Sequence, residues 1–218
     1  MTRAFIFPGQ GAQTIGMGRD LAEAYPAARA VFDEVDAALG EKLSALIWEG
    51  DQDTLTLTEN AQPALMATSI AALRALEAEG VGIGAASYVA GHSLGEYTAL
   101  TAAGALTVTN AARLLRARGK AMQAAVPVGE GAMAAILGLD LAAVRAVVAQ
   151  TAKGEVLAAA NDNDPAQVVI SGAKAAVERA VEVAKEKGAK RAVLLPVSAP
   201  FHCDLMVNIF TFFKYSFN

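Results

Sequence analysis

A serine lies between two glycines in the stretch Gly91-His92-Ser93-Leu94-Gly95, directly after a short apolar run and directly before a segment of helical character. A serine hydroxyl can attack a carbonyl carbon when a sharp turn between a strand and a helix holds it exposed, and flanking glycines supply the space and backbone angles of such a turn. The N–H groups at the start of the following helix also face the oxyanion that develops during the attack. The pattern predicts that Ser93 is a nucleophile.

The general base for this serine would be one of the two histidines, His92 and His202. A neutral imidazole, with an unperturbed pKa of about 6.5, can take the serine proton near neutral pH. His92 adjoins the serine in sequence and is badly placed as its base, so we expect it to pack or hydrogen-bond within the turn. His202 follows Pro200-Phe201 in a loop after an expected strand, which favours catalysis over the alternative of a hydrogen-bonded core histidine.

Composition and charge exclude several classes of protein. The net charge of −4 argues against a nucleic-acid binder, which normally shows a basic excess. Charged residues interrupt every apolar run before it reaches the roughly 18 residues of a membrane span, so we expect no membrane association. The single cysteine, Cys203, excludes an internal disulfide, and the histidines and the cysteine lack metal-ligand spacing. The missing ligand spacing leads us to expect no metal. Because the N-terminal apolar run is too short for a secretion signal, we also expect a cytoplasmic protein.

The elements that must hold these residues alternate between short apolar runs and helical periodicity. We expect strands over residues 4–7 and 88–90, and helices over residues 17–39, 62–79, 94–103 and 110–125. Pro63 suits the first turn of its helix, and Gly80 suits the cap at its end. This alternation predicts an α/β fold with a hydrolase-like parallel sheet.

From residue 131 the pattern becomes more compact. We expect strands over residues 133–139, 156–160, 168–171 and 191–197, and helices over residues 141–152 and 173–187. The order βαββαβ is that of a ferredoxin-like unit. We therefore predict that an α/β domain over residues 1–130 and 198–206 carries an inserted ferredoxin-like subdomain over residues 131–197.

The last twelve residues, 207–218, differ in composition from the rest of the chain. They contain four of the eight phenylalanines and no alanine, a residue that is abundant before them. Such an abrupt change indicates a foreign or out-of-frame end, and the alternative is an unusual native strand or helix.

Three motifs stand in order along the chain: Phe7-Pro8-Gly9-Gln10-Gly11-Ala12-Gln13, Gly91-His92-Ser93-Leu94-Gly95-Glu96-Tyr97 and Pro196-Val197-Ser198-Ala199-Pro200-Phe201-His202-Cys203. Together they resemble the malonyl-CoA:acyl carrier protein transacylase family of fatty-acid synthesis and the acyltransferase domains of polyketide synthases. The likeness covers residues 1 to about 206. Members of the family continue well beyond that point, so the resemblance implies a truncated chain that lacks the family's histidine-orienting glutamine.

The resemblance assigns a role to five residues. It implies Ser93 as nucleophile, His202 as general base, Arg118 as the ligand of the malonyl carboxylate, and the N–H groups of Gln10 and Leu94 as the oxyanion hole. Arginine suits a carboxylate because its planar donors bind both oxygens, which lysine cannot do. A solvated surface charge is the alternative for Arg118, and a brace for its glycine-rich loop is the alternative for Gln10.

The resemblance also implies a reaction. Ser93 would accept the malonyl group from malonyl-CoA, and the phosphopantetheine thiol of acyl carrier protein would then take it from the ester, as a step of fatty-acid biosynthesis. No cofactor is implied, and family members are expected to be monomers. Two alternatives remain: a serine hydrolase or thioesterase that uses the same turn, and an inactive fragment that only binds carrier protein.

Overall fold

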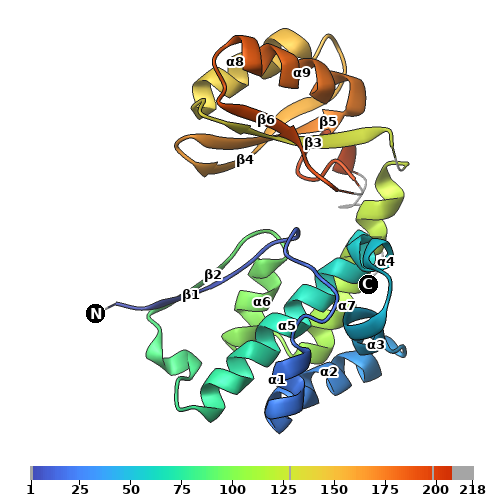
Figure 1. Cartoon of the computed structure of the whole chain (residues 1–218), viewed down its shortest axis with the longest axis vertical. Helices are drawn as coiled ribbons and strands as arrows, with labels where there is room; N and C mark the ends of the chain where they lie inside the picture. Colours follow the sequence, from blue (N-terminus) through green and yellow to red (C-terminus); the bar gives the residue numbers. More distant parts are fainter. Residues whose placement is uncertain (1, 128, 198, 208–218) are drawn as a thin grey trace. The chain divides into compact units, whose positions relative to one another are not determined.

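The computed structural model describes residues 2–127, 129–197 and 199–207. The chain forms two compact units, which divide between Lys120 and Ala121 (Figure 1). The predicted domain boundaries at residues 130 and 197 are not tested by this division and stay a prediction. Except for Val207, the atypical end lies outside the described residues.

The first unit contains a two-stranded parallel sheet and most of the helices. Strand β1 (Ala4–Phe7) pairs in register with β2 (Tyr88–Gly91), with Ala4 opposite Tyr88 and Phe7 opposite Gly91. The helices are α1 (Arg19–Ala24), α2 (Pro26–Leu39), α3 (Leu43–Glu49), α4 (Gln52–Thr56), α5 (Thr58–Ala78), α6 (Gly95–Ala102) and α7 (Val108–Ala125), with a short 3-10 turn at Ile83–Ala85. The last residues of α7, from Ala121, belong to the second unit. These strands and helices confirm the α/β class for this unit.

Helix α5 is the centre of the first unit's core. It is apolar on nearly every side, as expected for a helix that neighbours surround, and it packs against α2 and α7. The fully buried members of this core include Phe32, Ile47, Leu55, Met66, Ile70, Leu94 and Leu115. Trp48, the only tryptophan of the chain, lies at the edge of this core with its ring 5.0 Å from that of Phe32 in an edge-on arrangement.

The helix boundaries in this unit correct the sequence prediction at three places. The single helix expected over residues 17–39 is wrong: Tyr25 is extended, and Pro26 starts a second helix, because proline suits a first turn but not an interior position. Helix α5 begins at Thr58, four residues earlier than expected, so Pro63 lies in its second turn. Two short helices, α3 and α4, had no prediction.

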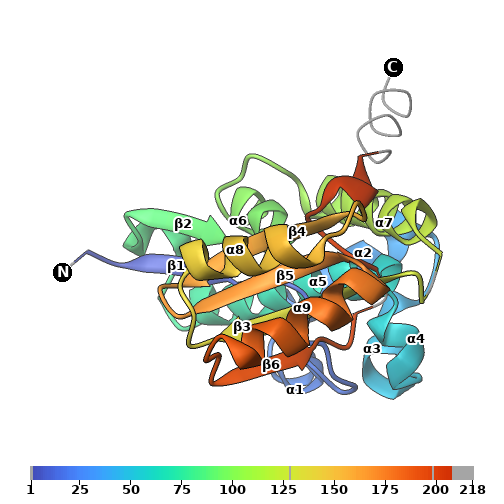
Figure 2. The same cartoon turned by 90° about the horizontal axis from the view of Figure 1, so that it is seen from above.

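The second unit is a four-stranded antiparallel sheet with two helices. Its strands are β3 (Gly131–Leu137), β4 (Leu157–Asp164), β5 (Gln167–Ala173) and β6 (Arg191–Leu194), in the order β4-β5-β3-β6, and its helices are α8 (Leu141–Thr151) and α9 (Lys174–Glu186). Helices α8 and α9 lie together over one face of the sheet (Figure 2). The element order βαββαβ and this strand order confirm the ferredoxin-like arrangement.

The two faces of this sheet bury different partners because side chains alternate along a strand. In β3, Ala134 and Ile136 point to the helices, whereas Met133 and Ala135 point to the opposite face. That opposite face packs against a segment after β6, in which Phe201 and Met206 are buried, and against the end of α7. In the described part of the chain, no helix combines the length and apolar character needed to cross a membrane.

Candidate active site

Ser93 lies on a sharp turn between strand β2 and helix α6. Its φ is 55°, a left-handed backbone angle that is uncommon for a residue other than glycine. Three backbone hydrogen bonds hold the turn: the His92 N–H donates to the Phe7 carbonyl (3.1 Å), the Gly95 N–H to the His92 carbonyl (2.9 Å), and the Glu96 N–H to the Ser93 carbonyl (3.1 Å). The strand, turn and helix expected around this serine are therefore present.

The glycines of the turn are required by close backbone contacts. A Cβ atom at Gly91 would lie 1.9 Å from the carbonyl carbon of Gly95, and one at Gly95 would lie 2.4 Å from the Phe7 carbonyl oxygen. The start of α6 thus passes against the ends of both parallel strands. This contact fixes the backbone on either side of the serine, which is half-buried.

The two N–H groups expected to form an oxyanion hole come from the loop after β1 and the start of α6. Leu94 precedes α6, and its side chain is 1% exposed, which anchors the backbone directly after the serine. Gln10 lies in the loop after β1, where its side-chain Oε1 accepts a hydrogen bond of 2.6 Å from the Thr58 hydroxyl. The Gln10 side chain therefore braces its loop, and the role of its backbone N–H in an oxyanion hole stays a prediction.

Arg118, on α7, reaches the nucleophile directly. Its Nη2 donates to Ser93 Oγ at 3.1 Å, and its Nη1 donates to Gln62 Oε1 at 2.5 Å. The guanidinium carbon also lies 5.8 Å from the centre of the Tyr97 ring, a cation–π distance. Burial lowers the pKa of Arg118, and the nearby Tyr97 and Glu96 oppose that shift; the group remains a cation at neutral pH. Arg118 is thus a positioned charge beside the serine rather than a solvated surface residue.

Two buried polar residues of α5, Thr58 and Gln62, connect these groups and were missed by the sequence prediction. Gln62 Nε2 donates to the Thr58 hydroxyl at 3.1 Å, so a hydrogen-bonded chain runs from Gln10 through Thr58, Gln62 and Arg118 to Ser93. Thr58 is 0% and Gln62 1% exposed. Buried polar groups need partners, so polar residues at the start of an otherwise apolar helix were the signal that could have found them.

His202 belongs to the second unit, and the other four expected site residues belong to the first. Its φ is 58°, and its side chain is exposed between two buried anchors of the sheet face, Phe201 and Met206. The neighbouring Cys203 thiol donates to the Pro200 carbonyl at 3.2 Å, and burial raises the pKa of this thiol, which disfavours a reactive thiolate. The buried side chains of Phe201 and Met206 therefore hold the backbone that carries the imidazole.

The other histidine, His92, has an exposed side chain whose ring lies against the loop after β1. A Cβ atom at Gly9 would lie 2.6 Å from His92 Nδ1. This contact fits the expectation that His92 packs within the turn.

Comparison with known proteins gives consistent matches along this chain. A family model described as the acyl transferase domain matches residues 4–212, which extends past residue 206, where the sequence motifs place the end of the likeness. The malonyl CoA-acyl carrier protein transacylase of Bacillus subtilis is 55% identical over 204 residues, covering 93% of this chain and 63% of that protein. This chain therefore spans a little under two thirds of that relative's length.

Solved structures agree in fold. The acyl-carrier-protein-S-malonyltransferase of Bartonella henselae superposes with a TM-score of 0.93 at 59% identity, covering 98% of this chain and 68% of that chain. A malonyl-transacylase solved in complex with its type II polyketide-synthase acyl-carrier protein superposes with a TM-score of 0.91 at 45% identity, covering 96% and 67% of the two chains.

Proposed function

This chain belongs to the acyl transferase family, and on that premise we propose that it transfers a malonyl group from malonyl-CoA to the phosphopantetheine thiol of acyl carrier protein. The observation that carries the proposal is the hydrogen bond between Arg118 and the hydroxyl of Ser93. In malonyl-CoA one methylene separates the thioester carbon from a free carboxylate. A cation within hydrogen-bond distance of the nucleophile can bind that carboxylate while the serine attacks the thioester.

The first half of the reaction forms an ester and releases CoA. Ser93 Oγ attacks the thioester carbon as His202 takes the hydroxyl proton, and the N–H groups of Gln10 and Leu94 donate to the oxyanion. When the C–S bond breaks, the proton held by His202 passes to the departing thiolate. The products are malonyl-Ser93 and CoA, and the imidazole is neutral again.

The second half reverses these roles with a different thiol. His202 takes the proton of the phosphopantetheine thiol, whose sulfur attacks the malonyl ester, and the proton returns to Ser93 Oγ as the ester C–O bond breaks. The carrier protein as acceptor is supported by the names of the similar proteins, one of which was solved with its acyl-carrier protein. We include in the proposal a monomeric protein of the cytoplasm, and an inserted subdomain over residues 131–197.

Intact-protein mass after brief exposure to malonyl-CoA tests this function. The protein should gain one malonyl group, which acyl carrier protein then removes. Ser93→Ala should gain none, and Arg118→Ala should gain it only at much higher malonyl-CoA. Loss of the label in buffer as fast as with carrier protein would indicate a hydrolase. A folded protein that binds carrier protein but never gains the label would refute the proposal in favour of an inactive fragment.

A further inference from the structure

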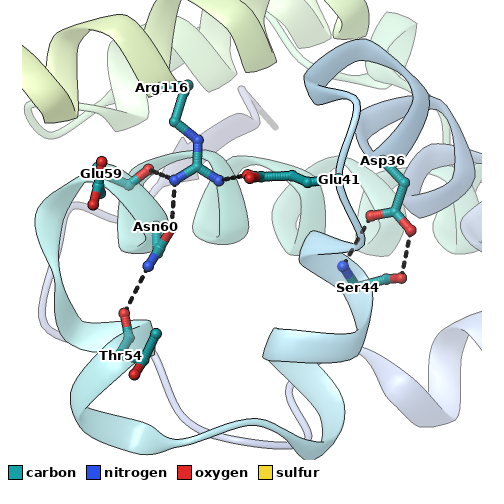
Figure 3. A network of polar contacts seen from close by, with 7 residues as sticks. All are labelled: Asp36, Glu41, Ser44, Thr54, Glu59, Asn60 and Arg116. Carbon is teal, nitrogen blue, oxygen red and sulfur yellow. Dashed lines mark hydrogen bonds and ion pairs between the residues drawn. The ribbon is translucent and has the colours of Figure 1, made fainter.

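Helix α5 contains Pro63 at a position where the helical pattern requires a backbone N–H. In an α-helix the N–H of residue 63 donates to the carbonyl of residue 59, but proline has no N–H and its ring crowds that carbonyl. The Glu59 carbonyl instead accepts a hydrogen bond of 2.8 Å from Nη1 of Arg116, on helix α7 (Figure 3). A side chain from a second helix therefore supplies the donor that Pro63 lacks.

Arg116 is held in this place by two further acceptors. Its Nη1 also donates to the Asn60 side-chain oxygen, and its Nη2 forms an ion pair with the Glu41 carboxylate (Figure 3). Asn60 in turn donates to the Thr54 carbonyl at 2.8 Å. The Arg116 side chain is only 12% exposed, and its planar guanidinium engages these acceptors together, which fixes its geometry.

The same region is where α7 crosses the first turn of α5. A Cβ atom at Gly119 would lie 2.5 Å from the Glu59 Cα and 2.7 Å from the Thr58 carbonyl oxygen, so the two backbones are in direct contact. Arg118 adjoins this crossing and bonds Gln62, one turn along α5 from Thr58. A contact that holds the first turn of α5 against α7 therefore also holds Gln62, the hydrogen-bond partner of Arg118, in place.

We propose that Arg116 is a positioning residue: it replaces the missing donor of Pro63, fixes the first turn of α5 against α7, and so keeps Gln62 and Arg118 aligned beside Ser93. Arg116 contacts none of these three residues in the hydrogen bonds described, so it acts through the helix. The consequence for malonyl transfer rests on the proposed function. The contacts by which Arg116 joins α7 to the first turn of α5, which we call the Arg116 clamp, do not.

The test combines a substitution of Arg116 with a substitution of Pro63, the residue whose missing N–H the arginine is proposed to replace. Pro63→Ala restores an N–H that can donate to the Glu59 carbonyl, so it should make Arg116 less necessary. Arg113→Met is the control, because Arg113 lies on the same helix and donates to a backbone carbonyl outside α5, that of Ala38. The readout is the concentration of malonyl-CoA that half-saturates labelling of Ser93, measured by intact mass, with acetyl-CoA as an acyl donor that has no free carboxylate.

Arg116→Met should raise the half-saturating malonyl-CoA concentration about tenfold. This is the effect expected if a misaligned Arg118 loses one charged hydrogen bond to the malonyl carboxylate. The rise should be smaller for acetyl-CoA, since Arg118 has no carboxylate to bind there. Adding Pro63→Ala should return the value to within about threefold of the starting protein, and Arg113→Met should leave it unchanged. Equal effects on both acyl donors, or no recovery with Pro63→Ala, would overturn the positioning role.

The stabilising role of the Arg116 clamp can be tested by protein unfolding, without any measurement of catalysis. If the unsubstituted chain gains no malonyl group, the proposed function fails, and urea unfolding of the starting protein, Arg116→Met, Pro63→Ala and the double variant still decides the inference about Arg116. Arg116→Met should then lower the unfolding midpoint more in the presence of Pro63 than together with Pro63→Ala. Equal shifts in the two backgrounds would show that Arg116 does not replace the proline's missing donor.

Discussion

Gln62 offers two substitutions of similar size that should separate the stability of the site from its binding of substrate. Its side chain is 1% exposed and joins Arg118 Nη1, at 2.5 Å, to the Thr58 hydroxyl, at 3.1 Å. A hydrogen bond to a charged group contributes about 1.5–3 kcal/mol and a neutral one about 0.5–1.5 kcal/mol. Gln62→Leu removes both, and the added apolar burial of leucine offsets about 1–2 kcal/mol. We expect a net loss of about 1–3 kcal/mol in the free energy of unfolding.

Gln62→Glu keeps the shape and places a carboxylate against the Arg118 guanidinium. The ion pair should hold the free energy of unfolding within about 1 kcal/mol of the starting value, because its attraction offsets the desolvation of the new charge. The guanidinium is then already paired when malonyl-CoA arrives. The loss of one charged hydrogen bond to substrate corresponds to a rise of about 10- to 100-fold in the half-saturating malonyl-CoA concentration.

Urea unfolding and intact-mass labelling, run on both variants, measure these two quantities. Gln150→Glu is the control, since it adds the same charge at an exposed position of α8. A folded Gln62→Glu protein that loads malonyl-CoA at the original concentration would refute the assignment of Arg118 to the substrate carboxylate. A Gln62→Leu protein of unchanged stability would refute the energetic role given to Gln62.

Three further predictions follow from local geometry. Gly95→Ala should abolish labelling and lower the free energy of unfolding by about 3 kcal/mol or more in urea, because its Cβ would lie 2.4 Å from the Phe7 carbonyl oxygen; a fully labelled variant would contradict the close contact. Ser93→Gly and Ser93→Ala should both be unlabelled, yet calorimetry should find the glycine variant about 1 kcal/mol more stable because φ is 55°; equal melting temperatures would contradict the strain. The pKa of Asp51 is lowered by hydrogen bonds from the Thr54 N–H and hydroxyl, so its contribution is present above the pKa of an unfolded aspartate, about 3.9, and is lost as pH falls through the folded value. Asp51→Ala should therefore reduce the melting temperature at pH 7, and the reduction should shrink as the pH falls below the pKa of an unfolded aspartate; a reduction that is the same across this range would contradict the role of the charged carboxylate in the cap.

The features that the sequence predicted well depend on neighbours in the chain. The turn at Ser93 follows from an apolar run and two glycines within five residues, and the second sheet follows from its regular βαββαβ order. The features it missed depend on distant groups. Helix α5 starts before Pro63, and the group that donates to the Glu59 carbonyl is Arg116, 57 residues later in the chain.

The short helices α3 and α4 were missed for a related reason. Their helical character comes from burial of a few side chains, Leu43, Ile47 and Leu55, and from the Asp51 cap, rather than from a long periodic pattern. The roles of Thr58 and Gln62 could not be read from periodicity, because a polar residue on an apolar helix shows its purpose only when its partners are known.

The place of Trp48 gives the molecule an intrinsic optical probe of one half of its chain. It is the only indole, and it lies in the first unit, edge-on to Phe32 and 5.2 Å from the Arg29 guanidinium. Fluorescence excited at the red edge of protein absorption therefore reports the surroundings of α2 and α3, while circular dichroism averages over both units. If the two signals change at different denaturant concentrations, the units unfold separately, and stability differences measured for Gln62 or Arg116 variants can be assigned to the unit that contains them.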